Sequence, residues 1–133
     1  MAAMAKVEKS QAEWLAQLGE EAFRVTRQAG TERAFSHPGF PKQPGKFTCA
    51  CCGEVLFTQG TKFESGCGWP SFFAPASGAP IAEHVDRSLG MERVEVTCEN
   101  CGAHLGHVFE DGPLPTGQRY CINGVALGFE AED

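Results

Sequence analysis

The sequence has no long hydrophobic run and no cluster of Lys or Arg, and each absence excludes a class of function. A membrane-spanning helix needs about 20 apolar residues, which no segment of the chain approaches. With 17 acidic and 11 basic residues the formal net charge is -6, whereas binding to a nucleic-acid duplex requires a basic face. The N-terminal segment MAAMAKVEKSQAEW also lacks the apolar stretch of a secretory signal. We therefore expect a cytoplasmic protein that binds neither membrane nor nucleic acid.

Cysteine, in contrast, is abundant, with seven among 133 residues. A reducing compartment disfavours a static disulfide framework, so metal binding and thiol chemistry are the two expected uses of these side chains. The length suits one domain, residues 1–133, with a modest core, and we expect a monomer.

The first third of the chain is predicted to be helical and then irregular. Residues 1–9 are expected to form a disordered tail, and residues 10–45 a helical and irregular segment. Ser10 and Glu13 have the spacing of a capping box that starts a helix, and Gly30 is expected to cap the end of a second helical stretch, EEAFRVTRQAG. One side of the first helix is predicted to be apolar: Trp14, Leu15 and Leu18.

Residues 46–129 are predicted to form a zinc-containing β core, because the apolar period changes to two after Lys46. KFTCACCGEVLFTQ is typical of a hairpin whose turn holds the cysteines, and in MERVEVTC the side chains of Val94, Val96 and Cys98 share one face. The fold class expected from these patterns is a small, mainly β, mostly antiparallel domain with two short N-terminal helices packed on it.

Two C-x-x-C-G knuckles, CACCG and CENCG, are the strongest structural motif of the chain. Three cysteines crowd the first knuckle. We choose Cys49 and Cys52 because Cys52 precedes Gly53 just as Cys101 precedes Gly102. Glycine permits the tight backbone turn, and two such turns give a closed set of four thiolates, the structural type for one Zn²⁺. The predicted ligands are Cys49, Cys52, Cys98 and Cys101.

Two other interpretations of the knuckles are weaker. Reduced core cysteines would not need the paired spacing, and a dithiol redox motif would not need two copies with matched glycines. The 45 residues between Cys52 and Cys98 exceed the spacing of a simple zinc ribbon, so the metal is expected to join two distant strands.

Cys121 stands outside both knuckles, in GQRYCINGVALGF. In a strand Arg119, Cys121 and Asn123 share one face, while Tyr120 and Ile122 share the other. A thiol beside a guanidinium has its thiolate form favoured, and Asn123 can donate a hydrogen bond to an oxygen near the sulfur. We interpret Cys121 as a reactive thiol, with a buried inert cysteine as the alternative.

Cys67 lies in SGCGWPSF, a loop whose glycines allow a thiol to move toward another sulfur, as a resolving thiol must. Trp69 in the same loop offers a large apolar ring with an N–H donor, with a core aromatic as the alternative. Cys51 is interpreted as a spare thiol within the first knuckle.

The segment CGAHLGHVFEDGP contributes His104 and His107, each of which can transfer protons or be a satisfied core histidine. Metal ligation is not expected, because four thiolates already complete the zinc site. Phe109 and Asp111 share the strand face of His107, and Asp111 can also be only a turn residue.

These motifs, together with VTRQAGTERAF, occur in an order that closely resembles the methionine-R-sulfoxide reductases, the B type of methionine sulfoxide reductase. The resemblance runs from about Ser10 to Phe129. It implies two antiparallel β-sheets with N-terminal helices and a zinc ion opposite the active site. It also implies reduction of methionine-R-sulfoxide, free or in proteins, with thioredoxin as the reductant.

The same resemblance implies roles for individual residues. Cys121 matches the nucleophile, which becomes a sulfenic acid, and Cys67 matches the resolving cysteine, which forms a disulfide with it. Trp69 matches the residue that receives the substrate methyl group, and Phe109 is placed with it as a substrate contact. The polar ring around the sulfoxide is expected to comprise His104, His107, Asp111, Arg119 and Asn123.

Three features depart from the pattern of this family. The segment HPGFPKQPGK stands where the family often has a more acidic or aromatic one, Gly124 stands where Ser is common, and Cys51 is extra. None falls on the residues that carry the chemistry.

Two other functions are weighed against the reductase. A zinc-ribbon-like binding module explains the knuckles but leaves Cys67 and Cys121 unused. A Cys–His hydrolase fits GCGW but does not need a second exchangeable cysteine.

Overall fold

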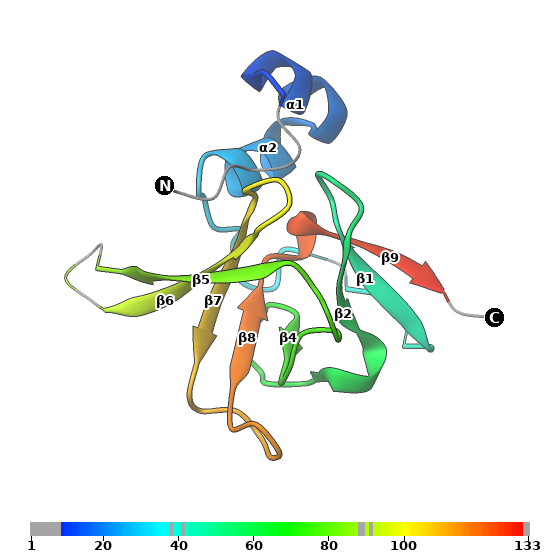
Figure 1. Ribbon diagram of the computed structural model, residues 1–133, viewed down its shortest axis with the longest axis vertical. Coiled ribbons are helices and arrows are strands. Elements are labelled where there is room, and N and C mark those ends of the chain that lie inside the picture. The colour runs from blue at the N-terminus through cyan, green and yellow to red at the C-terminus, as the bar shows by residue number, and fades with distance from the viewer. Residues whose placement is uncertain (1–8, 38, 41, 88–89, 91, 132–133) are drawn as a thin grey trace.

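The computed structural model describes residues 9–37, 39–40, 42–87, 90 and 92–131. Two antiparallel β-sheets form the body of the molecule, and two short helices lie at one end of it (Figure 1). This architecture confirms the mainly β class, the two sheets and the N-terminal helices. Of the predicted tail only Lys9 lies within the described residues, and its ammonium sits 4.9 Å from the centre of the Trp14 ring.

The first helix, α1, spans Gln11–Leu18 and begins at the predicted capping box. The Glu13 N–H donates to the Ser10 hydroxyl at 3.2 Å, and the Glu13 carboxylate accepts from the Ser10 N–H at 3.0 Å. Trp14 is buried as predicted, but Leu15 is 41% exposed, so its assignment to the apolar side is wrong. Adjacent residues of a helix point about 100° apart, so the face that buries Trp14 and packs Leu18 on the core leaves Leu15 toward solvent.

The second helix, α2, spans Glu20–Arg27 and ends before the predicted cap. Gln28 is the C-cap, and Ala29 takes the left-handed conformation (φ +53°) that was expected of Gly30. The Gly30 N–H still closes the helix end by donating to the Arg24 carbonyl at 3.0 Å. No helix among the described residues is long and apolar enough to cross a bilayer.

The smaller sheet has three strands in the order β2–β1–β9. Strands β1 (Gly45–Cys49) and β2 (Val55–Thr58) form the predicted hairpin, with the first knuckle in its turn. Strand β9 (Leu127–Ala131) pairs with the other edge of β1 and follows a 3₁₀ turn, η3 (Gly124–Ala126).

The larger sheet has six strands in the order β3–β4–β8–β7–β6–β5. The β5–β6 hairpin projects from the body, while β7 and β8 lie at its centre (Figure 1). A 3₁₀ turn, η1 (Gln59–Thr61), connects β2 to this sheet. The strands span Lys62–Phe63 (β3), Ser71–Phe72 (β4), Ile81–Asp86 (β5), Arg93–Cys98 (β6), His104–Phe109 (β7) and Arg119–Ile122 (β8).

Aromatic side chains from both sheets build the core between them. Phe57 of β2 stacks on Phe72 of β4 with ring centres 4.3 Å apart, and Phe47 of β1 meets Phe72 edge-on at 5.0 Å. Tyr120 and Ile122 of β8 are 3% and 0% exposed, which confirms the predicted core face of that strand. Truncating one such ring to Ala costs about 3–5 kcal/mol, so this packing fixes the strand that carries Cys121.

Candidate active site and metal centre

The two knuckles bring four cysteine sulfurs together. Gly53 and Gly102 have φ values of +82° and +80°, a conformation that glycine adopts without strain. Their N–H groups donate to the carbonyls of Cys49 and Cys98, at 2.9 and 2.7 Å, and so close each turn. The four sulfurs lie within 4.8 Å of one another and belong to the predicted residues Cys49, Cys52, Cys98 and Cys101.

This quartet fits a zinc ion. Zn–S bonds of about 2.3 Å in a tetrahedron separate neighbouring sulfurs by about 3.8 Å. The Cys49–Cys101 and Cys52–Cys98 sulfurs are 3.5 and 3.6 Å apart. Four thiols without a carboxylate or imidazole favour structural zinc over a hard cation.

Hydrogen bonds among the four thiols already favour charge on two of them. Donation by Cys101, and then by Cys49, lowers the pKa of Cys98 to about 4. Donation by Cys49 lowers the pKa of Cys101 to about 6, while the pKa of Cys49 itself is raised because its proton is held by Cys101. A zinc ligand must be a thiolate, so the cluster is prepared for a cation.

Cys121 lies in a row of residues that crosses one face of the larger sheet. Its Cα pairs with His107 of β7 on one side and with Ser71 of β4 on the other, and His107 pairs with Glu95 of β6. Residues directly opposite each other in antiparallel strands point to the same face. The register therefore sets a histidine and a serine beside the thiol.

Cys67 lies in the loop between β3 and β4 and contacts Cys121 on this face of the sheet. The two sulfurs are 3.5 Å apart, so the structure brings together the predicted nucleophile and the predicted resolving thiol. The Ser65 hydroxyl lies 2.9 Å from the Cys67 sulfur and 2.7 Å from the Ser71 hydroxyl. A disulfide needs sulfurs about 2.05 Å apart, so a small movement of the loop closes the bond.

The pKa values of the two thiols are shifted in opposite directions. Burial, and then the charge of Cys67, raise the pKa of Cys121 to about 12, although Arg119 acts to lower it. Burial also opposes ionisation of Cys67, but hydrogen bonds from Ser65 and Ser71 outweigh it and bring its pKa to about 7. Arg119 thus favours the Cys121 thiolate as expected, but burial and the nearby Cys67 sulfur, which the sequence does not reveal, outweigh it.

Arg119 is held by Asp111 and by an aromatic ring. Its Nε and one terminal nitrogen donate to the two Asp111 oxygens at 2.8 and 3.1 Å, which lowers the pKa of that carboxyl. The guanidinium carbon lies 4.5 Å from the centre of the Phe109 ring, a cation–π contact. Asp111 thus orients the cation, and the side chain of Asp111 is 63% exposed.

His107 and His104 have different surroundings. His107 Nε2 lies 3.0 Å from the Asp86 carboxylate, and burial lowers the pKa of its ring although Asp86 acts to raise it. His104 Nδ1 lies 2.6 Å from the Glu95 carboxylate, and its ring centre is 5.6 Å from that of His107. His107 lines the cavity beside the thiols, whereas His104 lies behind it.

Trp69 and Asn123 are tied together by Glu32, which sequence reasoning missed. The Trp69 indole N–H donates to the Glu32 carbonyl at 3.0 Å, and the Glu32 N–H donates to Asn123 Oδ1 at 2.9 Å. Asn123 Nδ2 donates to the Leu105 carbonyl at 2.9 Å. Glu32 is 1% exposed and its carboxylate accepts the Val125 N–H at 3.0 Å. Its only signal in the sequence was its place in GTERAF.

The thiols open into a cavity of about 270 Å³, which we call the thiol pocket. It combines an indole ring, a guanidinium and two sulfurs, so it offers apolar and polar surface to one small ligand. Of the predicted residues, His104 and Asp111 do not line it. Its walls are Thr31, Cys67, Trp69, Arg93, Gly106, His107, Phe109, Arg119, Cys121 and Asn123.

Sequence reasoning also missed Ser65, Ser71 and Asp86. Ser71 stood in the quoted loop motif, but only the strand register shows that it faces Cys121. Asp86 and His107 are 21 residues apart, on β5 and β7, and no local spacing relates them.

Two contacting thiols at a pocket, separate from four thiols that could hold a metal, are the arrangement expected of a thiol-based oxidoreductase. Comparison with known proteins agrees with this class. The SelR domain model matches residues 18–131, and the chain belongs to this family, the MsrB-type peptide methionine sulfoxide reductases.

Three similar proteins carry the name peptide methionine sulfoxide reductase MsrB. The protein from Hahella chejuensis is 53% identical over 131 residues, 98% of this chain and 94% of its own. The protein from Methanosarcina mazei is 55% identical, over 96% of this chain and 92% of its own. The protein from Methylibium petroleiphilum is 58% identical, over 94% and 91%.

Proposed function

We propose that this protein reduces methionine-R-sulfoxide, in oxidised proteins or free, to methionine. The observation that carries the proposal is the contact of Cys67 and Cys121, 3.5 Å apart, at the wall of a pocket that also holds Trp69 and Arg119. The names of the similar proteins support the same substrate. Cys121 contacts a second thiol, which a hydrolase does not need, and this contact favours redox chemistry over hydrolysis.

In the first step the Cys121 sulfur attacks the sulfoxide sulfur. The S–O bond of the substrate breaks, the oxygen passes to Cys121 as a sulfenic acid, and methionine leaves reduced by two electrons. The thiol proton of Cys121 passes to the oxygen, so this step needs no external acid.

His107 is the group we assign to that proton transfer. Its Cα pairs directly with that of Cys121, and burial lowers its pKa, so the ring is neutral at neutral pH. With Nε2–H directed to Asp86, the tautomer assigned from this carboxylate partner, Nδ1 can accept the thiol proton and return it to the oxygen. Arg119 stabilises the negative charge that develops on the sulfur and oxygen.

In the second step Cys67 attacks the sulfenic sulfur. A Cys67–Cys121 disulfide forms and the oxygen leaves as water. The pKa of Cys67, about 7, gives this thiol a substantial thiolate fraction at neutral pH. A dithiol, which we propose to be thioredoxin, then exchanges with the disulfide and restores both thiols.

The choice between epimers follows from the two sides of the thiol pocket. Trp69 offers an apolar ring whose only donor, the indole N–H, is already bound to the Glu32 carbonyl. The substrate methyl group therefore packs on Trp69, and the oxygen turns toward Arg119 and Asn123. The assignment of R rests on the family resemblance.

The remaining predicted residues act through their neighbours in this proposal. Asp111 and Phe109 orient Arg119, and Phe109 also contacts substrate, since it lines the pocket. His104 fixes Glu95 behind His107. Cys49, Cys52, Cys98 and Cys101 would hold a zinc ion that would stabilise the fold, and none of the four lines the thiol pocket.

The proposed setting is the cytoplasm, with one chain sufficient for activity. A single chain supplies every named residue of the pocket, and seven cysteines without a disulfide suit a reducing compartment.

Incubation with racemic methionine sulfoxide and a dithiol, followed by chiral analysis, tests the proposal. We expect the R epimer to be consumed and the S epimer to persist. Consumption of the S epimer alone, or of neither, would overturn it.

A further inference from the structure

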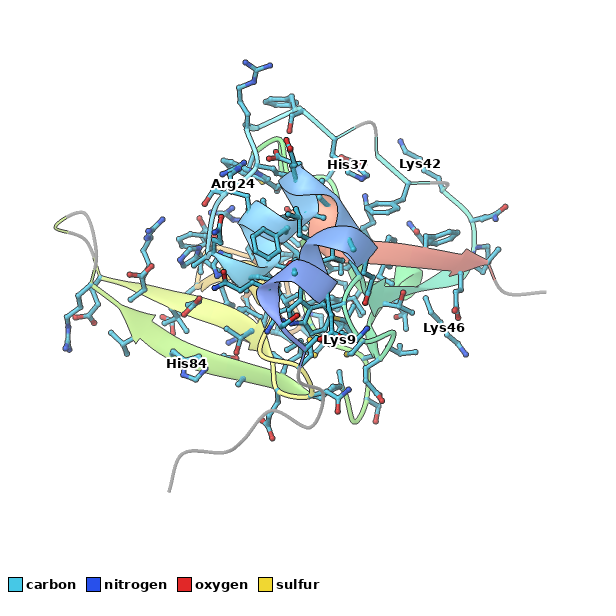
Figure 2. The ribbon with its side chains drawn as sticks, turned by 90° about the horizontal axis from the view of Figure 1, so that it is seen from above. Lys9, Arg24, His37, Lys42, Lys46 and His84 are labelled. Atoms are coloured by element: carbon cyan, nitrogen blue, oxygen red, sulfur yellow. The ribbon has the colours of Figure 1, made fainter. Side chains whose placement is uncertain are left out.

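A second cavity, of about 320 Å³, shares Trp69 with the thiol pocket. We call it the rim groove. Aromatic rings of the segment between α2 and β1 line one part of it, and the backbone of the Cys67 loop lines another. Figure 2 shows His37 and Lys42 on this segment, on the side of the molecule away from the β5–β6 hairpin. Of its residues, the proposed mechanism uses only Trp69 and Ser65.

Phe35 is the most unusual residue of the rim groove. Phe35 is 76% exposed, and its φ of +63° lies in a region that non-glycine residues rarely occupy. The Phe35 N–H donates to the Gly68 carbonyl at 2.8 Å, next to the resolving cysteine. A Cβ on Gly68 would lie 2.7 Å from the Phe35 ring, so the ring rests on that backbone. A strained backbone that holds an aromatic ring in solvent points to a ligand.

His37 forms a second wall, and its position requires Gly124. A Cβ at Gly124 would lie 2.4 Å from the His37 ring, so the imidazole occupies the space that a Ser side chain would take. His37 stacks on Phe40 at 4.7 Å, and Phe40 packs on Phe47 of the core at 5.1 Å. Two departures from the family pattern, the HPGF segment and Gly124, thus meet in one contact.

Charge at the rim groove is locally positive, in a protein of net charge -6. Lys42 and Lys62 lie 3.9 and 3.8 Å from the same Glu64 oxygen, so two cations share one carboxylate. The Lys62 side chain is only 15% exposed, which limits its screening by water. The groove therefore suits an apolar side chain with an acidic neighbour.

We propose that the rim groove binds residues that flank methionine sulfoxide in an oxidised polypeptide, with a preference for an aromatic residue beside an acidic one. This inference rests on the proposed function. Consecutive Cα atoms are about 3.8 Å apart, so a chain with methionine sulfoxide in the thiol pocket can pass Trp69 and place a neighbouring side chain against Phe35. Free methionine sulfoxide cannot reach the groove.

The test compares N-acetylmethionine-R-sulfoxide amide with blocked peptides in which methionine-R-sulfoxide is flanked by Phe or by Gly, on either side, and in which the residue beyond the Phe is Asp or Asn. The variant is Phe35→Gly, which removes the ring and suits the left-handed backbone. The matched control is Val85→Ala, a 58% exposed apolar residue on β5 that lines neither cavity. Lys42→Glu reports on the charge preference.

We expect Phe35→Gly to lower kcat/KM about tenfold for the best Phe-flanked peptide and less than about twofold for the small amide. Val85→Ala should leave kcat/KM unchanged for both substrates. Lys42→Glu should remove the preference for an acidic neighbour. An equal loss of kcat/KM for the Phe-flanked peptide and for the small amide in Phe35→Gly would overturn the inference, since Phe35 would then only support the Cys67 loop. Unchanged kinetics on both would overturn it as well.

A binding measurement separates failure of this inference from failure of the proposed function. Calorimetry of the same peptides with Cys121→Ser protein measures their affinity without turnover. If the wild-type protein reduces none of the substrates, tighter binding of the Phe-flanked peptide that Phe35→Gly abolishes still supports the groove. Equal binding of Phe- and Gly-flanked peptides would overturn it.

Discussion

The knuckle quartet and the redox pair place sulfurs at almost the same separation but in different surroundings. The contacts are 3.5 and 3.6 Å in the quartet and 3.5 Å between Cys67 and Cys121. Two glycine-closed turns fix the quartet, and sulfur contacts sulfur there. One strand and one glycine-rich loop hold the redox pair, among hydroxyls, a guanidinium and a pocket. The distance between thiols therefore does not determine their chemistry; the backbone and charges around them do.

Removing a quartet thiol should have the largest effect. Cys98→Ser should lose zinc and unfold, because structural zinc contributes roughly 10–16 kcal/mol in zinc-finger peptides, as much as a whole domain's stability. The matched control is Cys51→Ser, a buried thiol outside the quartet, which should keep both metal and fold. Thermal unfolding and metal analysis provide the measurement. A Cys98→Ser protein with the wild-type melting temperature would contradict the structural role of the quartet.

Removing the resolving thiol should affect turnover without affecting stability. Cys67→Ser should lose thioredoxin-dependent turnover, because the sulfenic acid on Cys121 has no intramolecular partner, yet one methionine should form per chain. Rapid-quench analysis of methionine measures the first turnover, and the melting temperature should stay at the wild-type value. Full thioredoxin-dependent activity would contradict the assignment of Cys67.

Weakening the contact between Asp111 and Arg119 should have an intermediate effect on activity. Asp111→Asn breaks the two-point contact that orients the guanidinium, and we expect kcat/KM to fall about tenfold, about 1.4 kcal/mol of transition-state stabilisation. Stability should change by less than about 1 kcal/mol, since the carboxylate is largely exposed. Glu21→Gln, which breaks the exposed Arg24–Glu21 pair, is the control and should leave activity unchanged. An unchanged kcat/KM in Asp111→Asn would contradict the role of Asp111 in orienting the Arg119 guanidinium.

Alkylation should show the smallest effect, a shift along the pH axis. A lowered pKa means that the thiolate is present above it, so iodoacetamide should modify Cys67 with a rate that rises through about pH 7. Cys121, with a pKa raised to about 12, should react slowly below pH 9. In Cys67→Ser the neighbouring charge is gone, so the reaction of Cys121 should move to lower pH. Peptide mapping that finds Cys121 modified first at pH 7 would contradict this order.

Local patterns predicted much of the molecule. The capping box, the cysteine hairpin and the two faces of β8 follow from spacing along a few residues, and the structure confirms them. The quartet was predicted because matching glycines distinguished Cys52 from Cys51.

What the sequence could not provide depends on contacts between distant segments. The strand register sets Ser71 beside Cys121, and Asp86 reaches His107 across the sheet. The pKa of Cys121 is raised by burial and then by a sulfur 54 residues away. Leu15 was misjudged because it lies about 100° around the helix from Trp14, and Gly30 because Ala29 already takes the left-handed conformation.

The central claim is that the quartet binds metal while Cys67 and Cys121 carry the redox chemistry. A single turnover without reductant tests it most directly. Reduced, zinc-loaded protein is mixed with excess methionine-R-sulfoxide, quenched with an alkylating agent and mapped by mass spectrometry. The account predicts one methionine and one Cys67–Cys121 disulfide per chain, with zinc retained and the quartet free of disulfides. A disulfide within the quartet, or methionine formed with Cys67 and Cys121 both still reduced, would contradict it.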